Sequence, residues 1–88
     1  MLTVAKIDTY ARFDGDLDAW ARSRATGAAP GMADADWYLI DELLLDLAIV
    51  AAGRASAAFR AAVDAKLRAV LADEAACAAL HALAQRAR

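Results

Sequence analysis

The segment from Asp34 to Gly53 is the densest block of large aliphatic side chains in this chain. A helix that is apolar on nearly every side must be covered on nearly every side. The remaining residues are therefore expected to fold around this segment. Between Ala35 and Ala52 the only interruptions are acidic: Asp36, Asp41, Glu42 and Asp46.

The composition indicates an all-α fold in a single domain spanning residues 1–88. A chain of 88 residues makes one domain. Apolar types make up 61% of it, but many are alanine, which forms helices readily and buries little surface. Four glycines, one proline and few β-branched residues argue against strands. We expect a compact bundle of about four helices.

The helical periodicity predicts helices over residues 3–24, 35–52, 57–72 and 74–86. The residues 25–33, which hold the only proline, are expected to form a loop. Gly53 stands where a left-handed C-terminal residue belongs. Side chains that can accept a hydrogen bond from the first turn precede the four helices, and the expected N-caps are Thr3, Asp34, Ser56 and Asp73.

The first predicted helix contains a glycine near its middle. Its apolar stripe, which includes Ile7, Tyr10 and Leu17, keeps the helical phase through Gly15. This continuity favours one helix over residues 3–24. The alternative is two short helices broken at Asp14–Gly15, with Gly15 as a C-cap and Asp16 as the next N-cap.

The central segment has two apolar faces. The stripes of the first and third helices can cover the main face, which is Trp37, Ile40, Leu43, Leu44, Leu47, Val50 and Ala51. The second face holds Tyr38, Leu45, Ile49 and Ala52. The last helix offers only Leu80 and Leu83, so either this thin lid or another molecule covers the second face.

Patterns typical of metal sites are incomplete. Three alternating acids, Asp14, Asp16 and Asp18, resemble the start of a calcium loop, but alanines stand where that loop needs its glycine and final glutamate. Cys77 and His81 lie one turn apart and make half of a zinc site, without further Cys or His to complete it. No metal or cofactor is expected.

Catalytic patterns are also missing. Neither Ser23 nor Ser56 lies in a nucleophile elbow, and the sequence has no glycine-rich phosphate loop. A helical chain of this size has little room for a deep pocket. We therefore expect no enzyme activity.

The charge pattern argues against nucleic acid and membrane as partners. The net charge is −2, with −5 on residues 1–50 and +3 on residues 51–88. Four bases form a cluster: Arg54, Arg60, Lys66 and Arg68. This cluster predicts a face complementary to the acidic half rather than a phosphate-binding patch.

A membrane is also disfavoured as a partner, because carboxylates within the central segment would each cost about 2.5–3.5 kcal/mol at a bilayer centre.

The single cysteine fits a reducing compartment, and the first residues lack the pattern of a signal peptide. The bias toward Ala, Arg, Asp and Leu is typical of a GC-rich bacterial genome. The sequence thus predicts a small cytoplasmic helical protein that acts by protein–protein contact, as a homodimer or with another protein, through Tyr38, Leu45 and Ile49. The alternative is a cation- or small-ligand-binding module that uses the acidic N-terminal half, where Glu42 and Asp46 could share a cation.

Overall fold

The computed structural model describes residues 1–27 and 32–86, and it confirms the all-α class. Within this part of the chain the only strand-like pairing is a single bridge between Leu2 and Leu71. The described residues form five helices: α1 Val4–Arg12, α2 Leu17–Ala25, α3 Asp34–Ala51, α4 Ala57–Val70 and α5 Glu74–Arg86.

The single helix expected over residues 3–24 is wrong, and the alternative break at Asp14–Gly15 is what the structure contains. Asp14 and Gly15 have φ of 50° and 72°, so both adopt the left-handed conformation. Asp16 then accepts a hydrogen bond from the Ala19 N–H at 3.0 Å and begins α2. The apolar stripe was misleading because the spacing of apolar residues in the sequence stays helical across the four-residue connection, although the backbone there is not helical.

Three of the four expected N-caps are confirmed. Thr3, Ser56 and Asp73 each accept a hydrogen bond from a backbone N–H three residues later, at 3.3, 3.1 and 2.8 Å. The prediction for Asp34 is wrong: Ala33 is the N-cap of α3, and Asp34 is its first helical residue. The Asp34 carboxylate instead pairs with Arg24 at the end of α2.

The other element boundaries agree with the sequence to within two residues. Gly53 has φ of 73°, as expected for the residue that ends α3. α4 ends at Val70 because Leu71 is extended, with φ of −85° and ψ of 136°. Residues 28–31 of the expected loop lie outside the described residues.

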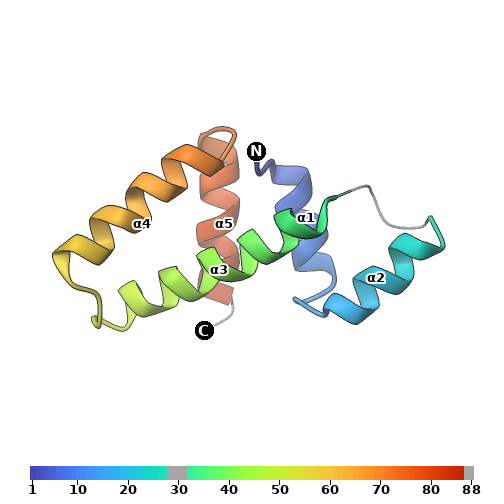
Figure 1. Cartoon of the computed structure of the whole chain (residues 1–88), viewed down its shortest axis with the longest axis horizontal. Coiled ribbons are helices and arrows are strands. Elements are labelled where there is room, and N and C mark those ends of the chain that lie inside the picture. The colour runs from blue at the N-terminus through green and yellow to red at the C-terminus, as the bar shows by residue number, and fades with distance from the viewer. Residues whose placement is uncertain (28–31, 87–88) are drawn as a thin grey trace.

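The other four helices are arranged around α3, which crosses in front of α1 and α5 (Figure 1). α4 folds back along α3, while α2 extends the molecule at the opposite end, giving overall dimensions of 44 × 24 × 19 Å. No helix among the described residues has the length and hydrophobicity needed to cross a membrane.

The N-terminal segment is fastened to the connection between α4 and α5. The Leu2 N–H donates to the Val70 carbonyl at 2.7 Å, and the Ala72 N–H donates to the Leu2 carbonyl at 2.9 Å. Both Leu2 and Leu71 are buried. This pairing places the start of α1 beside the start of α5, and the two helices pack together.

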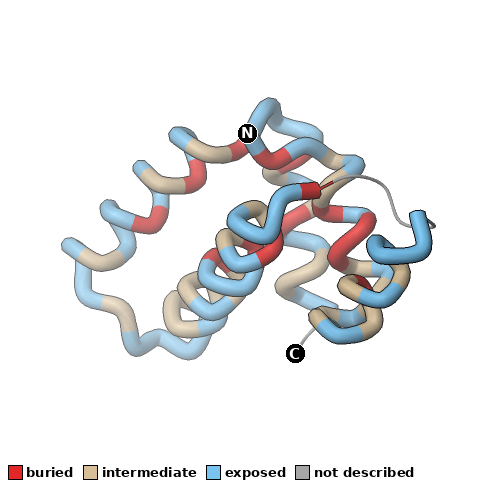
Figure 2. Tube along the Cα trace, turned by 45° about the vertical axis from the view of Figure 1, so that its right-hand side comes forward, coloured by how far each residue is buried: buried red, intermediate tan, exposed pale blue. Residues whose placement is uncertain are grey.

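The core lies where the helices meet, and Figure 2 shows its buried residues in red. On α3 the buried residues Trp37, Ile40 and Leu43 belong to the expected main face. Trp20 of α2 stacks on Trp37, with ring centroids 4.7 Å apart and an interplanar angle of 12°. The Tyr10 ring of α1 also packs against Trp37, with ring centroids 4.5 Å apart. This aromatic stack joins α1, α2 and α3.

Gly15→Ala is expected to destabilise the protein more than Gly53→Ala. Both residues have positive φ, so both substitutions cost about 1–2 kcal/mol in the left-handed region. A Cβ at Gly15 would also lie 3.0 Å from the Tyr10 hydroxyl, whereas nothing lies within 4 Å at Gly53. The additional crowding should lower the free energy of unfolding by about 1 kcal/mol more. Urea denaturation measures both; equal losses would contradict the close approach to Tyr10.

Trp20→Ala should lower the free energy of unfolding by about 3–5 kcal/mol, because it removes a fully buried aromatic ring from the only buried position of α2. Trp20→Phe should retain most of that stability, since it keeps a ring against Trp37 and removes an indole N–H that has no partner among the described residues. Thermal and urea unfolding, with near-ultraviolet circular dichroism for the stack, check this. An alanine variant as stable as the wild type would show that the stack does not hold α2.

Candidate functional site

The candidate interaction residues lie together on the outer face of α3, defined here as Tyr38, Leu45 and Ile49. Tyr38 and Leu45 are 55% and 62% exposed, and Ile49 is half-buried. Their spacing of seven and four residues places them along one line of the helix, opposite the buried Ile40 and Leu43. Sequence periodicity alone thus located the least covered apolar face of the helix.

The last helix does not cover this face. α5 packs against α1 and α3, with Ala76 and Leu80 fully buried, and leaves Tyr38 and Leu45 exposed. Apart from these two, the only exposed large apolar residue in the described part of the chain is Met1. A lid formed by α5 is therefore not what the structure shows.

One flank of the outer face is fixed by a hydrogen bond from α1. The Tyr10 hydroxyl donates to the Asp41 carboxylate, across 31 residues of sequence. Burial of the phenol, together with the Asp41 hydrogen bond and negative charge, raises the pKa of Tyr10 well above its ordinary value. Sequence analysis missed this pair because no local pattern links a residue on one helix to a carboxylate on another.

The other flank is fixed by an ion pair from α4. The Lys66 ammonium bonds to Glu42 and lies 3.2 Å from an Asp46 carboxylate oxygen. The hydrogen bond to Glu42 is the largest cause of a raised pKa for Lys66, and Asp46 adds to it, while burial opposes it. The expected attraction between the basic and acidic halves is thus present at this point. The cation that Glu42 and Asp46 share in the structure is this ammonium.

Several other carboxylates of the acidic half are also engaged within the chain. Asp16 caps α2, Asp36 pairs with Lys6 at 3.0 Å, and Asp34 pairs with Arg24. Within the described residues, no three His, Cys, Asp or Glu side chains lie close enough together to hold a metal ion. The acidic half thus forms ion pairs and caps at these positions.

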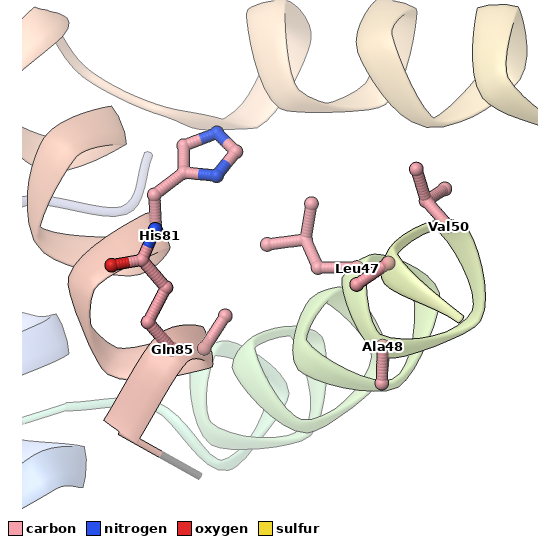
Figure 3. A pocket seen from close by; sticks show the side chains of 7 residues that line it. Leu47, Ala48, Val50, His81 and Gln85 are labelled. Carbon is pink, nitrogen blue, oxygen red and sulfur yellow. The ribbon is translucent and has the colours of Figure 1, made fainter. Parts of the chain in front are cut away.

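A hollow of about 170 Å³ opens between α3 and α5 (Figure 3). Leu47 and Val50 line it from α3, and His81 and Gln85 line it from α5. Cys77, one turn before His81, lines a different hollow beside Leu67 and Leu71. The two halves of the incomplete zinc pattern therefore face different surroundings. Neither hollow was foreseen, because such spaces depend on how whole helices are set against each other.

Lys66→Met should lower the free energy of unfolding by about 1 kcal/mol at neutral pH. The variant loses a partly exposed ion pair and leaves Glu42 and Asp46 as an unneutralised pair one turn apart. Because the pKa of Lys66 is raised in the folded state, the loss in free energy of unfolding relative to wild type should be constant below pH 10.5. It should disappear as the pH rises through the pKa of Lys66 in the folded protein. Tyr10 titrates in both proteins and cancels in the difference.

Arg60→Met, at an exposed base on the same helix, is the matched control and should have little effect. Urea denaturation between pH 7 and pH 11 measures both variants. If Lys66→Met and Arg60→Met change stability equally, the ion pair contributes nothing specific.

Comparison with protein-family models, with curated proteins and with solved structures finds no match to this chain. Inference about function therefore depends on the geometry of the outer face and of its two flanks.

Proposed function

We propose that this chain acts by protein–protein contact through the outer face of α3, without catalysis, in the cytoplasm. The observation that carries the proposal is the exposure of Tyr38 and Leu45 on one line of a helix whose opposite side carries the fully buried Trp37, Ile40 and Leu43. Exposed apolar side chains on one face of a helix are typical of interaction surfaces. Burying a leucine side chain contributes about 1.5–3 kcal/mol, so this face gains from a partner.

The flanks of the outer face support the same proposal. Asp41 and Glu42 border the apolar line, and each is held by a residue from a neighbouring helix, Tyr10 or Lys66. Fixed polar groups around an apolar centre resemble the rim and core of an interface. Because these side chains are already ordered, less side-chain entropy is lost when a partner binds.

Leu45→Glu should abolish association while leaving the isolated chain folded. Residue 45 is exposed, so the monomer should change in stability by no more than about 0.5 kcal/mol. A partner would have to bury the new charge, which is strongly unfavourable. Ala62→Glu, at an exposed alanine of α4, is the control with the same added charge.

Two measurements apply to both variants: light scattering of the purified protein after size-exclusion chromatography, and co-purification from the native host. The proposal is supported if association by either route disappears with Leu45→Glu and survives with Ala62→Glu. It is rejected if neither route shows association, or if Leu45→Glu leaves association unchanged.

Cation or small-ligand binding by the acidic half stays a prediction. Calorimetric titration with calcium, magnesium, manganese and zinc tests it. Measurable heat together with a raised melting temperature would support binding, since a ligand specific for the folded state stabilises it. Absence of both would remove this alternative.

A further inference from the structure

We propose that α2 is a releasable cover of the Trp37 ring, which opens as a unit while α1, α3, α4 and α5 stay folded. α2 lies at the end of the molecule opposite α4 (Figure 1). It packs less extensively against any other helix than those four pack among themselves. Segments with few buried apolar contacts open at a lower free energy than the whole fold. This opening goes beyond the proposed function, because it concerns the buried side of α3 and not its outer face.

The comparison with α1 shows how few contacts anchor α2. Both helices have nine residues, yet α1 has three buried residues, whereas Trp20 is the only one in α2. Leu17, the first residue of α2, is half-buried against the core. An isolated helix of this length is marginal in water. Loss of the Trp20 contact should therefore release the helix as a whole.

The connections on both sides of α2 contain residues suited to a hinge. Asp14 and Gly15 precede the helix with φ of 50° and 72°, and Gly27 follows it with φ of 76°. Glycine changes φ at little steric cost, so Gly15 and Gly27 can change conformation when α2 moves. The left-handed region is less favourable for an aspartate than the right-handed one, so opening also lets Asp14 relax.

Two buried donors at the contact favour opening. The indole N–H groups of Trp20 and Trp37 have no partner among the described residues. Water accepts a hydrogen bond from both once α2 has moved, so opening gains bonds that the closed state lacks. Burial of the two stacked rings opposes this gain and keeps the closed state dominant. The open state is therefore a minor one, but it is more populated than the unfolded chain.

An exposed ion pair makes the opening sensitive to salt. Arg24 pairs with Asp34 at the start of α3, and its guanidinium carbon lies 4.5 Å from the centroid of the Trp20 ring. Among the described residues this is the only ion pair that joins α2 to another helix. The two charged side chains are 40% and 60% exposed, so added salt screens their attraction. Higher salt should therefore increase the population of the open state.

Hydrogen exchange followed by NMR at neutral pH tests local opening in the wild-type protein. The amides of residues 21–24 in α2 should have protection factors at least ~10-fold lower than those of residues 40–47 in α3. Exchange in α2 should also depend only weakly on urea, because opening one helix exposes less surface than global unfolding. The Trp37 indole N–H should exchange through the same opening as α2, although the amides of residues 40–47 stay protected.

Val63→Ala separates local opening from global unfolding. Val63 is buried on α4, which stays folded when α2 opens, so its contacts are the same in the closed and the open state. The substitution should leave exchange in α2 and at the Trp37 indole unchanged. It should raise exchange of residues 40–47 about tenfold, because these amides exchange through global unfolding.

Arg24→Met should raise the exchange rates in α2 and at the Trp37 indole about five- to tenfold, because it removes the ion pair and the cation from the Trp20 ring. Sodium chloride at ~1 M should raise the wild-type rates in α2 about two- to fivefold, and Arg24→Met should lose this effect. Arg22→Met is the matched control. Arg22 is exposed on the same helix and forms no ion pair with the described residues, so this variant should exchange as the wild type does.

The inference is overturned if residues 21–24 and 40–47 have equal protection factors, or if Val63→Ala accelerates both sets to the same extent. In either case α2 opens only when the whole fold does. An indole N–H of Trp37 that follows residues 40–47 instead of α2 shows that α2 does not control access to this ring. If Arg24→Met accelerates exchange in α2 no more than Arg22→Met does, the ion pair does not hold the helix and the salt-sensitive opening is rejected.

Discussion

Burial of one face of α3 is the constraint on which the rest of this fold depends. Trp37, Ile40 and Leu43 have no exposed surface, and α1, α4 and α5 all pack against the helix that carries them. Each such side chain contributes about 1.5–3 kcal/mol when buried. Most of the stability of a helix in a small protein comes from packing of this kind. The neighbours of α3 are therefore placed by its inner face, and the outer face is what they leave uncovered.

The aromatic stack shows how local and distant interactions combine to attach α2. This helix has a single buried residue, Trp20, so its position depends on the contact with Trp37. Arg24 lies over the Trp20 ring, 4.5 Å from its centroid, and also pairs with Asp34. Neither indole N–H has a partner among the described residues, which costs about 1–3 kcal/mol each. Burying a Trp ring contributes about 4–6 kcal/mol, which is larger.

Electrostatic pairing explains why the outer face has ordered flanks. Lys66 from the basic half connects α4 to Glu42 and Asp46, and Tyr10 connects α1 to Asp41. These bonds hold carboxylates at the edges of the apolar line without covering its centre. Exposed ion pairs add little to stability, typically less than about 1 kcal/mol. Their main effect here is to order side chains at the edge of the proposed interaction surface.

The sequence by itself determined the helical class, the caps at Thr3 and Ser56, and the division of α3 into an inner and an outer face. Those features depend on residues within a few positions of one another, so periodicity and capping chemistry specify them. Only the tertiary structure decided the break at Asp14–Gly15, the pairing of Leu2 with the end of α4, and the course of α5 away from the outer face. The break interrupts one helix and allows Trp20 to contact α3. That contact joins residues distant in sequence, so a local sequence pattern cannot predict it.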